Sequence, residues 1–234
     1  MDEFNEQIQK LLVEFCEAPG QHLSVKGFHN SCAQISIRDA SDFVSAMNAK
    51  LVEPHRPRLY RAPQSCASEQ FFWSGKKDVS PRKITLWIEP IITVAALSRL
   101  HFELGWPAEH LGTQSRRWGF DLCAYEEPTP ASKPATSAMV IACEIKKSAV
   151  EIDVLIDLMR QFGSAPPGSI VAKSSKEKNA LKKIEEMRSV TPRYFWAVGP
   201  DALNHAFAVT YVGGGKIEFA RVQAADLQFK RLVG

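Results

Sequence analysis

The chain has 234 residues, a net charge of +3, 24% charged residues and 45% apolar residues. This length allows one sizeable core or a core with a modest second unit, the composition is that of a soluble globular protein, and the mild positive charge permits a polyanion partner without requiring one. No apolar run approaches the roughly 18 residues of a membrane span, and acidic residues stand where a secretory signal would be basic, so we expect a cytoplasmic protein that has no membrane partner.

The first 80 residues are expected to form an N-terminal helical and irregular segment that contacts substrate or a partner. Apolar residues at helical spacing predict a helix over 4–17, which Pro19 and Gly20 end. A strand is predicted over 32–37 and a second helix over 40–51.

A Pro- and Arg-rich stretch follows, with Tyr60 among Arg56, Arg58 and Arg61. Such a stretch can lie along a phosphate backbone, and it can equally be a solvated connector between elements. The residue pattern leaves both interpretations open.

The remaining residues, 81–234, are expected to form the main domain. Its first element is a helix within 86–106, because Pro90 suits a first helical turn and a broad apolar face follows it. Glu89 stands at or just before the start of this helix, and Gly105 ends it.

Two short apolar strands are predicted over 119–125 and 138–146, joined by a proline-containing loop. Side chains of a strand alternate between faces, so Glu144 and Lys146 share one face, and Asp121 stands opposite its neighbours. The other face of the second strand is predicted to carry Met139, Ile141, Cys143 and Ile145.

The C-terminal third continues with alternating elements. A capping box at Ser148 and Glu151 predicts that a helix begins directly after the second strand, and a charged helix is predicted over 175–188. A compact strand over 194–198 and a hairpin over 205–222 complete the pattern. We expect an α/β fold with a mixed central sheet flanked by helices.

Charged side chains inside apolar strands are costly to bury unless they pair or hold a metal. Asp121 and Glu144 on adjacent strands can share one face and hold Mg²⁺, which prefers hard oxygen ligands and keeps several waters. Lys146 beside them can orient a water and offset charge that develops on a phosphate. Metal-assisted phosphodiester hydrolysis fits this set. A salt bridge between Glu144 and Lys146 on a solvated edge strand is the structural alternative.

The sequence GFDLCAY followed by ACEIKKS resembles the PD-(D/E)XK nuclease superfamily, which has the restriction-endonuclease-like fold. That pattern is an Asp and, after a variable loop, an acidic-x-Lys triplet at the end of a strand. The resemblance implies that Asp121 and Glu144 bind the metal and that Lys146 is the catalytic lysine. It covers about residues 84–200, and Phe120 stands where the motif has its proline.

The superfamily pattern often adds a Glu from an upstream helix, which here implies Glu89, with Glu103 on the same helix as a rival. Ile145, between the two triplet charges, joins Asp121 and Glu144 among the implied metal ligands. The resemblance implies Mg²⁺ as cofactor, with Mn²⁺ as a substitute, and a restriction-endonuclease-like core that carries an N-terminal α-rich extension.

The expected function is therefore a metal-dependent endonuclease acting on DNA, in restriction or another defence against foreign DNA. The alternative is a nucleic-acid-binding or assembly subunit that keeps the fold without cutting, and RNA or branched DNA stays open as substrate. Cutting both strands would need two sites, which leaves a homodimer or a partner protein open.

Overall fold

A six-stranded mixed sheet lies at the centre of the computed structural model, which describes residues 1–19, 23–76, 79–115, 119–128 and 138–230. The strand order is β11-β10-β9-β8-β7-β6, in which β8 and β9 are parallel and the other neighbours are antiparallel. The strands are β6 (Leu111–Thr113), β7 (Leu122–Tyr125), β8 (Met139–Ile145), β9 (Tyr194–Val198), β10 (Asn204–Val212) and β11 (Lys216–Val222).

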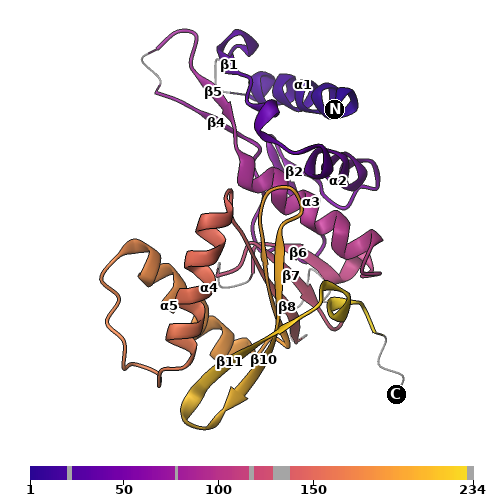
Figure 1. The fold of residues 1–234 in the computed structure, drawn as a ribbon. Helices are drawn as coiled ribbons and strands as arrows, with labels where there is room; N and C mark the ends of the chain where they lie inside the picture. Colours follow the sequence, from indigo (N-terminus) through magenta and orange to yellow (C-terminus); the bar gives the residue numbers. More distant parts are fainter. Residues whose placement is uncertain (20–22, 77–78, 116–118, 129–137, 231–234) are drawn as a thin grey trace.

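Helices cover both faces of this sheet (Figure 1). The helix α3 (Ile88–Phe102) packs on one face, and α4 (Ala149–Gly163) and α5 (Ser175–Val190) pack on the other. Ser148 caps α4 by accepting a hydrogen bond from the backbone N–H of Glu151, and a full capping box begins α5. The expected α/β class, with a mixed sheet between helices, is confirmed.

A β-bulge in the β7–β8 pair changes which residues of β8 share a face. Ala124 pairs with Ile141, but the next residue, Tyr125, pairs with Met139, so Val140 is extra. Met139 therefore packs with the residues under α4 and α5, and its predicted place on the α3 face beside Ile141 is wrong. The alternation holds beyond the bulge, where Cys143 and Ile145 face α3.

The first part of the chain forms two helices and two small sheets. The helices are α1 (Asp2–Glu17) and α2 (Ile37–Asn48); a three-stranded sheet has the order β1 (Phe28–His29), β5 (Ile84–Leu86) and β4 (Phe72–Ser74); and a hairpin pairs β2 (Glu53–Arg56) with β3 (Leu59–Arg61). The predicted strand over 32–37 is wrong. A 3₁₀ turn occupies Cys32–Gln34, and α2 begins at Ile37 because the Ser36 hydroxyl accepts a hydrogen bond from the N–H of Asp39 at 3.0 Å.

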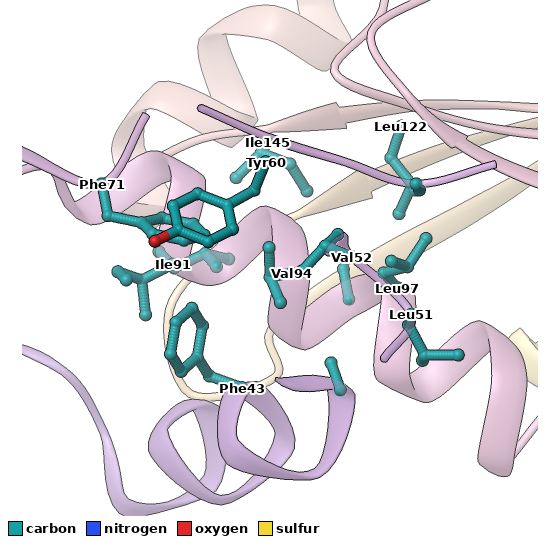
Figure 2. Packing of buried hydrophobic residues seen from close by; sticks show 14 of the residues in the cluster. Phe43, Leu51, Val52, Tyr60, Phe71, Ile91, Val94, Leu97, Leu122 and Ile145 are labelled. Carbon is teal, nitrogen blue, oxygen red and sulfur yellow. The ribbon is translucent and has the colours of Figure 1, made fainter. Parts of the chain in front are cut away.

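One continuous hydrophobic cluster joins this first part to the central sheet. Figure 2 shows Phe43 and Phe71 beside Ile91 of α3, with Leu122 and Ile145 of the sheet in the same cluster. The aromatic rings pack closely: Tyr60 stacks on Phe71 with centroids 4.8 Å apart. A buried ion pair adds to these contacts, because Arg99 of α3 pairs with Asp39 of α2. A domain boundary at residue 80 stays a prediction.

The five cysteines are free thiols, and four of them are buried. Among the residues that the structure describes, no helix combines the length and the apolar character needed to cross a membrane.

Candidate active site

Asp121 and Glu144 lie side by side on adjacent strands of the central sheet. Leu122 pairs with Cys143, which places Asp121, at the start of β7, next to the end of β8. The N–H of Asp121 donates to the carbonyl of Cys143 at 3.0 Å, and the N–H of Ile145 donates to Asp121 Oδ2 at 2.9 Å. Backbone contacts therefore fix the Asp121 carboxylate against the β8 residues that carry the acidic-x-Lys triplet.

Glu144 is the centre of a charged cluster, and only 3% of the residue is exposed. Its Oε1 lies 2.6 Å from the Nζ of Lys146, and its Oε2 lies 2.8 Å from the Nζ of Lys183. Two ammonium groups therefore hold one buried carboxylate, which offsets the cost of burying its charge. The Lys146 ammonium also donates to the carbonyl oxygen of Ile145 at 2.9 Å.

Lys183 reaches this cluster from α5 and is the site residue whose position the sequence reasoning missed. Its helix is rich in Lys and Glu, a pattern that fits either contact along a nucleic-acid backbone or a solvated helix face. The side chain is instead largely buried, and it donates to the carbonyl of Gly119 as well as pairing with Glu144. A signal was present: Ala180, Ile184 and Met187 form a buried stripe, and Lys183 lies at its border.

A close approach at Gly119 lets α5 sit against the start of β7. A Cβ atom on Gly119 would lie 1.9 Å from the Oε2 of Glu186, so no larger residue fits without displacing that carboxylate. Glu186 is buried and accepts a hydrogen bond from the hydroxyl of Ser115. Lys183 and Glu186, one turn apart on α5, thus both pack against Gly119, two residues before Asp121.

The structure separates the two acidic residues that compete for the helical role. Glu89, in the first turn of α3, lines the same cavity as Glu144 and Lys146. Glu103 stands at the other end of α3, where it pairs with Arg38 on the surface. Of the two, only Glu89 lies at the candidate site.

A cavity of about 220 Å³ opens beside these residues, between α3, the end of β8, α4 and α5. Its polar wall consists of Glu89, Glu144, Lys146, Lys147, Glu151, Lys176, Asn179 and Lys183. Apolar residues of α4, Val154, Leu155 and Leu158, also line it. A concave site with convergent charged groups and an apolar wall is typical of binding and active sites.

Burial and neighbouring charges shift the pKa values of three groups at the site, Asp121, Glu89 and Lys146. Burial and the neighbouring Glu144 raise the pKa of Asp121 to about 7, although Lys183 and Lys146 act in the opposite direction. Burial raises the pKa of Glu89, against the influence of Lys146. Burial lowers the pKa of Lys146, but Glu144 and Asp121 together outweigh it, so the net shift is upward and the amine is held as an ammonium.

Nearby thiols do not add a nucleophile to this set. Burial raises the pKa of both Cys123 and Cys143 well above the ordinary value, and each packs within the hydrophobic clusters. Cys123 belongs to the hydrophobic cluster under α4 and α5, and its role is packing.

The oxygen donors at the site are the carboxylates of Asp121 and Glu144 and the carbonyl oxygen of Ile145, which now accept from Lys146, Lys183 and the N–H of Ile145. Burial and the neighbouring Glu144 make ionisation of Asp121 unfavourable. A divalent cation would offset the repulsion between the two carboxylates, which contributes to the raised pKa of Asp121. An all-oxygen set with few protein ligands suits Mg²⁺, which keeps several waters. Within the described parts of the chain, no group of three or more His, Cys, Asp or Glu residues could hold a metal ion, so waters or substrate oxygens would have to complete the shell.

Comparisons with protein-family models, with curated proteins and with solved structures find no match.

Proposed function

We propose that the protein is a metal-dependent endonuclease of the PD-(D/E)XK type, which hydrolyses phosphodiester bonds of DNA. The observation that carries the proposal is the meeting of Asp121, Glu144 and Lys146 at the end of β8, where Glu144 and Lys146 line a cavity of about 220 Å³ and the backbone N–H of Ile145 holds Asp121 behind them. These residues come from separate stretches of sequence. Two carboxylates that can hold a metal ion and an ammonium group that can stabilise charge on a phosphate suit phosphodiester hydrolysis.

The order of elements supports the same proposal. The helix α3 has Glu89 in its first turn, and the short strand β6 follows it. Asp121 then directly precedes β7, the next strand β8 carries Glu144 and ends before Lys146, and the capped helix α4 follows at once. The resemblance to the nuclease superfamily implies this order of a Glu on an upstream helix, an Asp, and an acidic-x-Lys triplet at the end of a strand. The parallel pair of β8 and β9, joined through α4 and α5, places the triplet in the interior of the sheet, away from its edges.

Asp121 and Glu144, with the carbonyl of Ile145, would hold the Mg²⁺ ion. The ion would act as a Lewis acid on the phosphate and would make a bound water a better nucleophile. For Glu144 to serve, one of its two lysine contacts must loosen, since both of its oxygens are engaged.

Lys146 and Lys183 are placed to act on the phosphate as cations. The raised pKa of Lys146 keeps its amine protonated, so it stabilises negative charge and is not suited to remove a proton from water. Lys183 supplies a second ammonium group from the opposite helix, at the other oxygen of Glu144. Together they would draw a scissile phosphate to the end of β8 and offset the charge that develops as the bond breaks.

A non-cleaving subunit that keeps this fold is the second candidate, and one observation favours it. Glu144 is paired through both oxygens, which is the arrangement expected if the cluster serves stability and holds no ion.

Incubation of the protein with supercoiled plasmid, linear duplex and single-stranded DNA, each with Mg²⁺, Mn²⁺ or EDTA, separates the two candidates. The nuclease cuts only with metal, and Asp121→Asn abolishes the cutting. Thermal unfolding with and without Mg²⁺ gives a second readout. Mg²⁺ at ten times its Kd should stabilise the parent by about 1.4 kcal/mol and should leave Asp121→Asn unchanged. DNA binding without metal-dependent turnover or stabilisation would favour the subunit.

A further inference from the structure

The three-stranded sheet β1-β5-β4 buries one face and exposes the other. Phe72, Ile84 and Leu86 are buried, and the rings of Phe28 and Phe72 pack edge to face with centroids 5.8 Å apart. Trp73, Thr85 and His29 are next to these buried residues in their strands. Because side chains alternate along a strand, they lie on the exposed face. Trp73 stands opposite Thr85 on the paired strand, and His29 stands beside Thr85 on β1.

Two tryptophans lie on this exposed face. Trp73 is 62% exposed and Trp87 is 44% exposed, and their ring centroids are 6.4 Å apart with planes at 77°. Trp87 is the diagonal neighbour of Trp73 across the β4–β5 pair, with its own N–H donating to the carbonyl of Phe71. A pair of large exposed aromatic side chains is typical of an interaction surface, because exposed rings add nothing to the buried core.

The charge around the tryptophans is positive. Lys83, also diagonal to Trp73, is exposed, as is Lys76, two residues beyond the end of β4. None of the residues of β1, β4 and β5 is acidic. This combination of exposed aromatic rings and cations favours a polyanion with flat rings.

The exposed face runs directly into the candidate active site. Trp87 is the N-cap residue of α3, and Glu89, two residues later, lines the cavity. Figure 1 shows β5 leading into the start of α3, close to the start of α4. A chain held on the tryptophans would therefore reach the end of β8 within a short distance.

We propose that Trp73 and Trp87 form a stacking platform for the unpaired bases of single-stranded DNA, and that Lys83 contacts its backbone. The proposal rests on the proposed nuclease function and names its substrate class: DNA with a single-stranded segment at or beside the scissile bond. Bases in a duplex are stacked on each other and cannot offer their faces to a tryptophan, whereas each unpaired base has a free π-face.

The test measures binding of a labelled oligothymidylate of about 12 nucleotides, a length within the usual range for one single-strand site, by fluorescence anisotropy in EDTA. The protein carries Asp121→Asn throughout, so that no cleavage interferes. The variants are the double substitutions Trp73→Ala with Trp87→Ala and Trp73→Phe with Trp87→Phe. Phe102→Ala is the matched control, because Phe102 is 56% exposed and lies at the far end of α3. A duplex of the same length is the comparison ligand, and the oligomeric state of each variant is measured by sedimentation.

The Ala double variant should bind the single strand at least about tenfold more weakly, since stacking of one base contributes roughly 5- to 150-fold in affinity. The Phe double variant keeps two π-faces and should stay near the parent, as should Phe102→Ala. The parent should prefer the single strand to the duplex. An unchanged affinity in the Ala variant, or no preference for the single strand, would overturn the inference.

Two further results keep this inference distinct from the proposed function. If the Ala variant changes only the oligomeric state, the face serves self-association and the inference is overturned. Cleavage is measured separately, with Mg²⁺, in proteins that keep Asp121. Tryptophan-dependent binding together with no cutting by the parent would refute the nuclease alone, whereas metal-dependent cutting of duplex DNA at the same rate with and without both tryptophans would refute the platform alone.

Discussion

Two buried carboxyl groups in this protein are costly to ionise, and their raised pKa values show it. Asp121 and Glu69 both have pKa values raised to about 7, chiefly by burial. At Asp121 the nearby Glu144 adds to the effect, whereas at Glu69 hydrogen bonds from Gln114 and Thr113 reduce it. Asp121 lies beside Glu144, Lys146 and Lys183 of the candidate site, which gives the cost of its burial a functional reason, while none of these residues influences Glu69, which offers a reference for burial alone.

Glu69 predicts how stability varies with pH. Its pKa is raised in the folded protein from 4.5 to about 7, so between these values the folded state keeps a proton that the unfolded state has lost. The free energy of unfolding should therefore fall as pH rises through this window, by at most about 3 kcal/mol from this group. Denaturant unfolding at several pH values between 4 and 8, an interval of about four units around the window, measures the slope.

Glu69→Gln should flatten that slope and make the protein more stable than the parent above pH 7, because the amide carries no charge to bury. Asp121 and Glu89 also have raised pKa values and keep their contribution in both proteins, so the difference between the two slopes isolates Glu69. Parallel slopes for parent and variant would show that Glu69 does not titrate in this window.

At the scale of elements, α5 is decisive because it delivers Lys183 to a strand that is distant in sequence. The helix was expected from its pattern, and its start is fixed by the capping box at Ser174 and Glu177. The docking of α5 depends on Gly119, where the carbonyl accepts from Lys183 and a Cβ would meet Glu186. The position of a long charged side chain is thus decided by packing that local periodicity does not encode.

Lys183→Met tests the role of this helix. The substitution keeps most of the apolar stem but removes the cation that faces Glu144, so DNA cleavage should fall about 100-fold, the loss expected for one preorganised electrostatic contact. Lys182→Met is the matched control, because Lys182 is its exposed neighbour on the same helix. Initial cleavage rates with Mg²⁺ measure the effect, and thermal unfolding checks that both variants fold. Equal rates for the two variants would exclude a functional role for Lys183.

The elements that periodicity predicted and those that it missed differ in length and in context. Helices such as α1 and α4 have apolar residues at helical spacing, Ser148 caps α4, and β9 is a compact apolar run, so local patterns were sufficient. The strands of the β1-β5-β4 sheet are two or three residues long, too short for alternation to show. At Ser36 the capping hydrogen bond overrode an apparent strand pattern, and the bulge at Val140 broke an alternation that was otherwise right.

The same distinction applies to the candidate site. Asp121, Glu144 and Lys146 were found together because the pairing of two consecutive strands brings residues near in sequence into contact. For Glu89 to reach the site, the first turn of its helix must lie at the sheet. The position of Glu89 in the first turn of α3 made this predictable. Lys183 required knowledge of how α5 docks, which only the packed structure provides.

At the scale of the whole molecule, residues 1–80 and the central sheet share one core. Phe4 and Phe43, from α1 and α2, belong to the same hydrophobic cluster as Ile145 of β8. Asp39 strengthens this connection, because it binds Arg99 and also accepts a hydrogen bond from the N–H of Asp201 at 2.7 Å. We therefore expect the two parts to unfold together.

Asp39→Ala should destabilise the protein by about 3–5 kcal/mol, because it leaves the buried Arg99 without this partner. For a chain of this size that loss lowers Tm by roughly 6–20 °C. Arg193→Ala, which removes a solvent-exposed pair with Glu126, should cost less than about 1 kcal/mol and is the control. Circular dichroism and tryptophan fluorescence should follow one common transition. Two separate transitions, or similar losses in both variants, would contradict a shared core.

The most direct test of the central claim is the rate of Mg²⁺-dependent DNA cleavage by Lys146→Met, compared with Lys182→Met. Lys146 contacts Glu144 at the end of β8, whereas Lys182 is exposed on α5. We predict that the parent and Lys182→Met cut DNA with Mg²⁺ and not with EDTA, and that Lys146→Met is at least about 100-fold slower while remaining folded. Cleavage by folded Lys146→Met at the parent rate, or equal cleavage by the parent in EDTA, would contradict the account.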